Sequence, residues 1–230
     1  TILRSLGVLV VLVAIGFSFK DFIFNKIVLP PLTSDFHTYR FLCYLADLTK
    51  FPALCPESFQ IQMINITLSG QFMIHMLSSF MIAVIISVPY LLYESWKFIR
   101  PALYPDEKKS VGKIFLSSSV LFYLGAAISY FIIFPFTLRF LGTYQVSEVV
   151  VNQISIQSYM NTLALLVFFM GLAFELPVVM YLLSQIGVVN KQMLRTFRKY
   201  AFVVVLILAA FITPTTDPFT MMIVATPIYL

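Results

Sequence analysis

Glu175 is the residue whose chemistry is hardest to reconcile with its surroundings, because it interrupts a long apolar run within Phe174-Glu175-Leu176-Pro177. In a run that could cross a membrane, an ionisable carboxyl group costs at least about 2–3 kcal/mol, so it should face a bundle interior or a wet cavity. Gly171, one turn earlier, should leave room beside the carboxyl group for a partner. Two interpretations stay open: a functional polar site, or an interhelical hydrogen bond near the inner end of the span.

His75 is a second polar position within an apolar run, on one helical stripe with Gln71 and Ser78. No cysteine, aspartate or second histidine stands at ligand spacing, so hydrogen bonds between helices are expected and no metal is predicted. A membrane-embedded hydrolase using His75 would need a serine or acidic partner at the same depth. The sequence also lacks a nucleophile elbow, a zinc-protease motif, a P-loop and a dinucleotide-binding turn. We therefore expect neither an enzyme nor a cofactor.

Two acidic residues outside the apolar runs have simple structural explanations. Asp217 precedes Pro218, which is typical of an N-cap followed by proline at the first helical position. Glu107 stands beside Lys108 and Lys109, and such exposed pairs contribute little to stability. A binding role for either acid needs support from elsewhere.

The elements that position these residues must be membrane helices. Of the 230 residues, 60% are hydrophobic and 11% are charged, and the mean hydropathy is +0.94, so a water-facing surface with about a quarter of its residues charged cannot be built. In a bilayer every backbone polar group needs an internal partner, and long unalternating apolar runs suit helices. The expected fold is an all-α polytopic membrane protein, one domain with six transmembrane helices. The expected spans are 4–24, 70–93, 112–135, 157–183, 200–213 and 219–230.

The lengths and prolines of these spans predict the shape of the bundle. Spans five and six are short, since a helix of about 14 residues rises only about 21 Å and a hydrocarbon core is about 30 Å thick. Pro89, Pro135 and Pro177 should kink their helices into a concave, cupped bundle. Gly125 and Ser129, four positions apart, should let a neighbouring helix approach closely.

Basic residues predict the orientation. The expected cytoplasmic loops 94–111 and 184–199 hold nine of the fifteen Lys and Arg residues when Lys113 is counted with the first loop, and Arg4 makes ten. The positive-inside bias puts these loops and both chain ends in the cytoplasm, and the loop 25–69 outside. The net charge of +5 then reflects topology and contact with lipid, not nucleic-acid binding.

The outer loop 25–69 is expected to contain an amphipathic helix and both cysteines. Its apolar face would consist of Phe41, Tyr44, Leu45 and Leu48. Such a face predicts a short helix on the outer membrane surface, and the alternative is an irregular loop that packs its aromatic side chains on the bundle. Cys43 and Cys55 could close a disulfide bond in an oxidising compartment, or stay unpaired near the membrane surface.

Several motifs together are similar to one known family. Residues 93–104 read YESWKFIRPALY and are followed by Glu107. Further motifs are LFYLG at 121–125, AFELP at 173–177, FRKY at 197–200, and Thr213-Pro214 with Asp217. Over roughly residues 70–230, the motifs, their order and the predicted topology resemble the TatC family of the twin-arginine protein translocase.

The resemblance implies a receptor subunit in the bacterial cytoplasmic (inner) membrane. It would bind twin-arginine signal peptides of folded cargo and recruit single-span partners of the TatA and TatB type into an oligomeric complex, with energy from the proton motive force. By resemblance, Glu107 contacts the arginine pair, and Phe98 and Pro101 belong to the same recognition patch. Glu175 matches the family's intramembrane glutamate. Asp217 and Met221 fall at partner-contact positions near the last hairpin.

The sequence departs from the family in three places. The family's second recognition acid lies in an N-terminal segment without a counterpart in this sequence. The family often has glutamine where this sequence has Met221, and residues 32–60 form a longer segment than usual.

One other function is consistent with Glu175. The alternative to a receptor is a secondary transporter of a small solute or protons with Glu175 as the carrier. A transporter would predict inverted repeats and more intramembrane charge, and neither appears.

Overall fold

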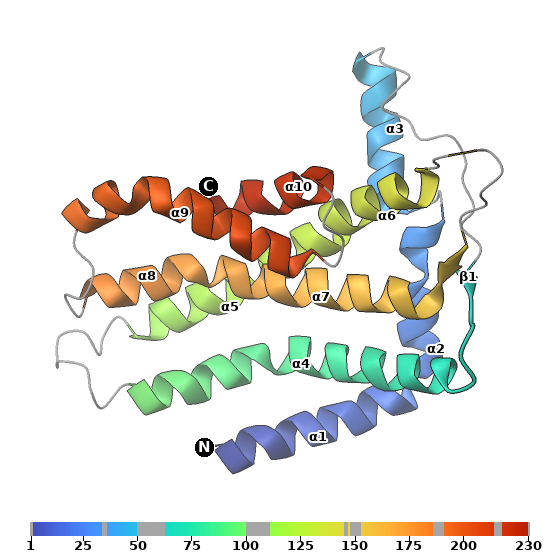
Figure 1. Cartoon of the computed structure of the whole chain (residues 1–230). Helices are drawn as coiled ribbons and strands as arrows, with labels where there is room; N and C mark the ends of the chain where they lie inside the picture. The colour runs from blue at the N-terminus through green and yellow to red at the C-terminus, as the bar shows by residue number, and fades with distance from the viewer. Residues whose placement is uncertain are drawn as a thin grey trace.

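The structure is a computed structural model that describes residues 2–33, 36–49, 63–99, 111–144, 147, 153–185, 191–213 and 218–229. It is a bundle of long helices with a smaller group of short elements at one end (Figure 1). The elements of the first half are α1 (Ile2–Ser18), α2 (Lys20–Ile23), the π-helical turn η1 (Phe24–Val28), the 3-10 turn η2 (Pro30–Leu32), α3 (His37–Thr49), β1 (Met63–Ile64) and α4 (Gly70–Ile99). Those of the second half are α5 (Val111–Ile128), the π-helical η6 (Ser129–Ile133), α6 (Phe134–Thr143), β2 (Ile154–Ser155), α7 (Ile156–Phe174), α8 (Leu176–Gln185), α9 (Lys191–Ile212) and α10 (Pro218–Tyr229).

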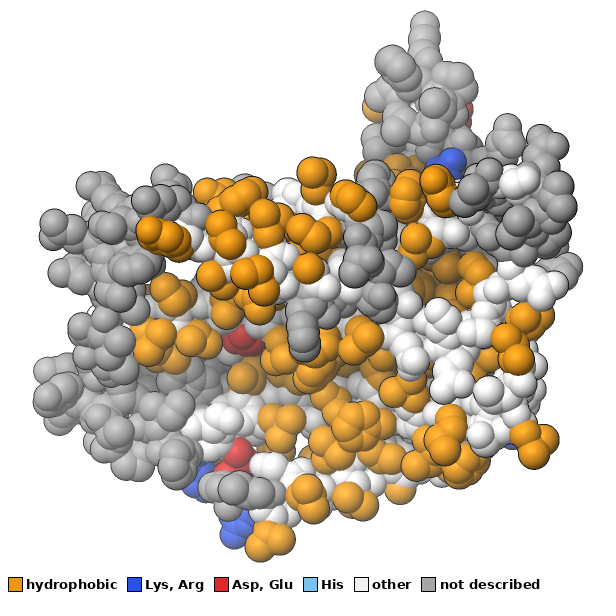
Figure 2. Space-filling view, viewed as in Figure 1, with side chains coloured by type: hydrophobic (Ala, Val, Ile, Leu, Met, Phe, Trp, Pro, Cys, Tyr) orange, Lys and Arg blue, Asp and Glu red, His pale blue; other side chains and the backbone are white. Residues whose placement is uncertain are grey.

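Among the described residues, three stretches of helix are long and apolar enough to cross a membrane. They are Gly70–Ser95, Leu116–Thr143 and Ile156–Ser184. The pair Leu3–Ser18 and Lys20–Leu48 would add a fourth if its 82° bend is counted within one span, and Tyr200–Ala210 is a shorter apolar helix. Hydrophobic side chains cover much of the bundle face in Figure 2, as a surface in contact with acyl chains requires. The chain is therefore a helical multi-pass membrane protein. The number of six spans stays a prediction.

The helices do not end where the expected spans end, because hydropathy does not report where a helix ends. The first helix stops at Ser18 and the chain then bends, within the expected span 4–24. The third span continues to Thr143 rather than ending at 135. Helix α4 runs on to Ile99, and α9 begins at Lys191, within the expected loop 184–199. Charged residues at a span's end can continue the helix into the interface, where water and headgroups solvate them.

The core lies between α5 and α7 and shows the predicted close approach. Phe122, Met160, Leu163 and Met170 are almost completely buried there. A Cβ atom added at Gly125 would lie 2.7 Å from the Met170 carbonyl oxygen, so the backbones approach closely because residue 125 has no side chain. The prediction for Gly125 is confirmed.

Tyrosine hydroxyls hold the short elements at the other end of the bundle. Tyr130 donates a hydrogen bond to the Ile27 carbonyl oxygen at 2.6 Å, and Tyr159 donates to that of Val28. These carbonyls belong to the last turn of η1, where a helix leaves its C=O groups without helical partners. The phenols supply those partners from η6 and α7 and so attach the end of η1 to the bundle.

Helix α3 projects sideways from this end of the bundle (Figure 1). Its base is anchored because the buried Tyr39 donates a hydrogen bond to the Pro135 carbonyl oxygen at 3.1 Å. Farther along, Phe41, Tyr44 and Leu48 are exposed. The predicted helix with an apolar face is confirmed, and the alternative of an irregular loop is wrong.

One small feature departs from the all-helical expectation. Strands β1 and β2 pair in parallel, with Met63 opposite Ile154 and Ile64 opposite Ser155. They join the segments that enter α4 and α7. Because both strands precede the long helices, this pairing does not conflict with the need for helices inside the bilayer.

Candidate functional site

Glu175 lies at a break between two helices. Helix α7 ends at Phe174, where the Glu175 N–H donates to the Leu172 carbonyl oxygen at 3.0 Å in a tighter turn. Pro177, which has no N–H, then stands in the first turn of α8, where no helical N–H is needed. The sequence FELP therefore interrupts the helix at the carboxyl-bearing residue and presents that side chain at an irregular point of the bundle.

Among the described residues, the carboxyl group of Glu175 has a hydrogen-bond partner at one of its two oxygens. Its side chain is only 9% exposed, and the Ser118 hydroxyl from α5 donates to Oε2. No partner of Oε1 is found among the residues that the structure describes, and the buried Ser119 hydroxyl is likewise unpartnered there. Both interpretations stay open, because the Ser118 hydroxyl supplies an interhelical hydrogen bond while the buried Oε1 has no partner among the described residues.

The expected room beside Glu175 is not there. A Cβ atom added at Gly171 would lie 2.6 Å from Cε2 of Phe122, so the aromatic ring of α5 already fills the space that the glycine leaves. Gly171 serves the packing of α5 on α7 and does not open a pocket. The prediction of space for a partner at Gly171 was wrong, because the sequence does not show which neighbouring side chain fills a small-residue position.

Glu94 is a second buried carboxyl group, which sequence reasoning missed. It is 7% exposed, its Oε1 accepts a hydrogen bond from the Tyr90 hydroxyl at 3.4 Å, and its Oε2 has no partner in the described part of the chain. The span expected over 70–93 places Glu94 in the loop 94–111. The spacing of Tyr90 and Glu94, one helical turn apart, was the available signal.

The residues expected to recognise a signal peptide are largely outside the described part of the structure. Pro101, Glu107 and Asp217 lie outside the described ranges, and Phe98 is placed only as a backbone position near the end of α4. Met221 lies on α10, partly buried against the core. The structure thus brings together Glu175 and Ser118 but leaves the recognition patch as a prediction.

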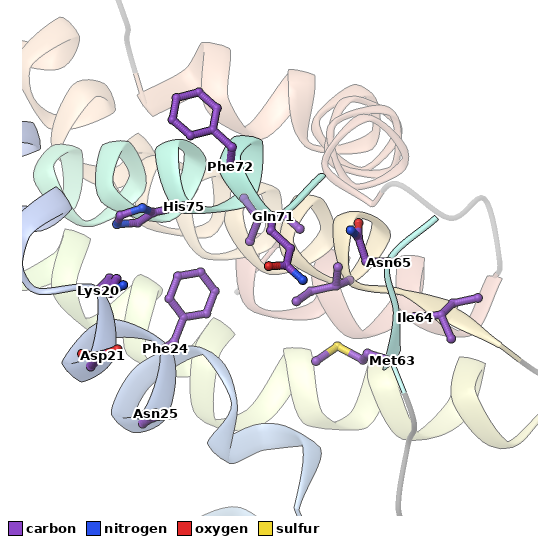
Figure 3. Close-up of a pocket in the computed structure, with 12 residues that line it drawn as sticks. Lys20, Asp21, Phe24, Asn25, Met63, Ile64, Asn65, Gln71, Phe72 and His75 are labelled. Carbon is purple, nitrogen blue, oxygen red and sulfur yellow. The ribbon is translucent and has the colours of Figure 1, made fainter. Parts of the chain in front are cut away.

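His75 makes the interhelical contact that its stripe predicted. Its Nε2 lies 3.1 Å from the Phe17 carbonyl oxygen of α1, and its ring stacks on the Phe17 ring at a centroid distance of 3.9 Å. Ser78 instead bonds within its own helix, to the His75 carbonyl oxygen. No group of three metal-ligating side chains occurs within the described ranges. His75 also borders a cavity of about 610 Å³ (Figure 3).

The two cysteines differ in what the structure describes. Cys43 lies in α3 and is disulfide-bonded. Cys55 lies outside the described residues, so its pairing with Cys43 stays a prediction.

Comparison with known proteins assigns the family. Residues 1–227 match the family described as Sec-independent protein translocase protein (TatC). The TatC protein of Blattabacterium from Periplaneta americana is 32% identical over 231 residues, which cover 100% of this chain and 86% of that protein. The TatC protein of Aquifex aeolicus is 34% identical over 194 residues, covering 84% and 79%. A crystal structure of the twin-arginine translocase receptor TatC superposes with a TM-score of 0.72 at 28% identity, covering 99% of this chain and 90% of that one. With sequence and fold in agreement over nearly its whole length, the chain belongs to the TatC family of Sec-independent protein translocase proteins.

Proposed function

We propose that this chain is the receptor subunit of a twin-arginine translocase. In this role it binds twin-arginine signal peptides of folded proteins and recruits TatA- and TatB-type single-span proteins, and export is driven by the proton motive force. The observation that carries the proposal is the likeness to the twin-arginine translocase receptor over 99% of the chain. The family is one of protein translocase components and not a known class of enzyme.

The proposed topology has six spans, with both ends in the cytoplasm of a bacterium and the chain in its inner membrane. The N-terminus, the end of α4 and the start of α9 lie at one end of the bundle in Figure 1. The basic Lys97 of α4 and Lys191 of α9 belong to these helix ends, which supports a common cytoplasmic face. Single cysteines introduced at positions 106 and 195, in a chain without its native cysteines, should label from the same face. Labelling from opposite faces would contradict the topology.

The proposed recognition site for the arginine pair consists of Glu107 with Phe98 and Pro101. A carboxylate accepts two parallel charge-assisted hydrogen bonds from a guanidinium, a geometry that the lysine ammonium cannot reproduce. We propose that Glu107 reads arginine in this way. The other residues would complete the surface on which the peptide lies.

Glu175, Asp217 and Met221 are the proposed contacts with partner helices. The free Oε1 of Glu175 supports a polar spot in an apolar bundle that a partner helix or an inserted signal can satisfy. We expect Glu175→Gln to keep signal-peptide capture and to weaken recruitment of single-span partners. Proton or solute flux through the chain alone, lost in Glu175→Gln, would favour the transporter alternative.

Peptide binding to the full chain in lipid nanodiscs tests the receptor function. A twin-arginine peptide should bind at least about tenfold more tightly than its twin-lysine counterpart. Glu107→Gln should weaken capture by about 1–3 kcal/mol, because one charge-assisted contact is lost, whereas the neighbouring Asp106→Asn is the matched control. Equal affinity for the two peptides would contradict the site, and binding of neither would contradict the receptor function.

A further inference from the structure

The cavity beside His75 lies where two long helices end at the same side of the bundle. It is bounded by α2 and η1, by the turn between β1 and α4, and by the first turns of α4 (Figure 3). Helix α1 ends at Ser18 and the chain bends by 82°, while α4 begins at Gly70. If α1 and α4 cross the bilayer, the cavity therefore lies at the depth of the lipid headgroups.

The polar lining of the cavity carries both signs of charge. Its polar residues are Lys20, Asp21, Asn25, Asn65, Gln71 and His75. Lys20 and Asp21 are adjacent in α2, and both are exposed. Their backbone carbonyl oxygens accept the Phe24 N–H, and no side-chain hydrogen bond or ion pair of either residue is found with a described residue, so both side chains can turn towards a ligand. A ligand that complements them has an anionic and a cationic group close together, as in a phosphate ester of ethanolamine.

The neutral polar groups suit the same ligand. In Figure 3 the Gln71 amide points into the space between α4, η1 and β1. A carboxamide can donate to phosphate oxygens and accept from a primary ammonium. The Nε2 of His75 lies against the Phe17 carbonyl oxygen, and in the neutral tautomer that carries its proton on Nε2 the Nδ1 atom is an acceptor. Carboxylate, amide and imidazole acceptors thus line the cavity, and a primary ammonium can donate hydrogen bonds to them whereas a quaternary ammonium cannot.

The turn that forms one wall is tightly built. The Asn65 Nδ2 donates to the Thr67 carbonyl oxygen at 3.0 Å, and a Cβ atom added at Gly70 would lie 2.1 Å from Asn65 Oδ1. Any residue other than glycine at position 70 would push the turn away from the start of α4. The wall is therefore preformed, which reduces the ordering cost of binding.

An apolar ridge leads from the cavity along α4. Phe72 borders the cavity, and Phe72, Met76 and Phe80 are 59%, 41% and 50% exposed. At four-residue spacing they lie on one face of the helix. An acyl chain attached to a headgroup in the cavity can lie along this ridge, so the surface accommodates both parts of a phospholipid.

We propose that this cavity is a binding site for a phospholipid whose headgroup carries a primary ammonium, as phosphatidylethanolamine does. The phosphate lies at Lys20, the ammonium lies at Asp21 and the neighbouring acceptors, and one acyl chain follows Phe72, Met76 and Phe80. The proposal requires only that α1 and α4 cross the bilayer. It is independent of signal-peptide binding.

Native mass spectrometry of the full chain in detergent tests the site. Phosphatidylethanolamine, phosphatidylcholine and phosphatidylglycerol with identical acyl chains are titrated in parallel. We expect phosphatidylethanolamine to bind about tenfold more tightly than either other lipid, because only it matches both charges with a hydrogen-bonding ammonium. Equal binding of all three lipids would overturn the proposal.

Variants separate the parts of the site. Asp21→Asn should remove the preference for phosphatidylethanolamine over phosphatidylcholine, and Lys20→Gln should weaken all three lipids about tenfold. The matched control is Lys26→Gln, an exposed lysine of η1 that does not line the cavity. If either charge variant fails to fold, Gln71→Met gives the same test through the amide and should lower phosphatidylethanolamine binding. Unchanged lipid preference in folded variants would refute the assignment.

A water-soluble headgroup distinguishes a lipid from a free phosphate ester. Glycerophosphoethanolamine should compete at least about a hundredfold more weakly than the diacyl lipid, because it leaves the apolar ridge uncovered. Equal competition would mean that the ridge contributes nothing and that the ligand is a soluble phosphate ester, which contradicts the lipid assignment.

Discussion

The Ser118 hydroxyl on α5 donates a hydrogen bond to Oε2 of Glu175, at the break between α7 and α8. This contact joins a residue in the first turns of one long helix to the interruption of another, 57 positions later in the chain. It gives the carboxyl group a single fixed partner and leaves Oε1 without one in the described part of the structure. The position of the carboxyl group therefore depends on the packing of α5 against α7.

Ser118→Ala should destabilise the bundle by about 1–3 kcal/mol, because a buried carboxyl group then loses its donor. The measurement is the free energy of unfolding in detergent micelles titrated with sodium dodecyl sulfate. Ser95→Ala is the control, since the Ser95 hydroxyl is exposed and bonds only within its own helix, to the Leu91 carbonyl oxygen at 2.8 Å. Equal losses in the two variants would contradict a specific role for Ser118.

Gly171→Ala should cost about 1–3 kcal/mol, because the new methyl group would collide with the rigid ring of Phe122. Gly7→Ala provides the matched control: its Cβ atom would have no heavy atom within 4 Å, and alanine is the better helix former. Thermal midpoints in the same detergent should fall for the first variant and stay level or rise for the second. A tolerated Gly171→Ala would mean that α5 and α7 can separate at little cost.

The sequence predicted what hydropathy and small-residue spacing determine. The membrane class, the close approach at Gly125 and the helix over α3 follow from local residue types, and the structure confirms them. Local residue types did not show that Phe122 fills the space beside Gly171, because this contact depends on which helix packs there and in what register. The turn after Ser18 was missed for a similar reason. The chain beyond that turn is attached at η1 by tyrosines more than 100 positions away, and local residue types do not show such contacts.

The candidate site was predictable only in part. Glu175 stood out because a carboxyl group in an apolar run is costly wherever it points. Glu94 did not stand out, because its burial depends on α4 continuing beyond residue 93. A charge near a span end is ordinary in a sequence, and only the packing around it shows that water is excluded.

Glu94→Gln should leave stability unchanged or raise it by about 1–2 kcal/mol, because a neutral amide removes the desolvation cost of a buried carboxyl group whose Oε2 has no described partner. Glu94→Lys should destabilise, since it buries a cation in the same place. Unfolding in detergent micelles gives both values. A loss above about 2 kcal/mol in Glu94→Gln would show that the carboxylate makes an ionic contact essential to the bundle.

Tyr39→Phe should weaken the attachment of α3 by about 0.5–1.5 kcal/mol, because the hydrogen bond to the Pro135 carbonyl oxygen is lost. Burial raises the pKa of Tyr39 to about 12, against the opposing charge of Arg139. The neutral phenol is therefore the form that folding favours. The contribution of the Tyr39 hydrogen bond to stability should be complete below pH 10 and decline as the pH rises from 10 towards 12. Faster amide hydrogen exchange at the base of α3 is the expected readout. The exposed Tyr44→Phe serves as the control, and equal exchange in the two variants would show that the hydroxyl of Tyr39 does not hold the helix.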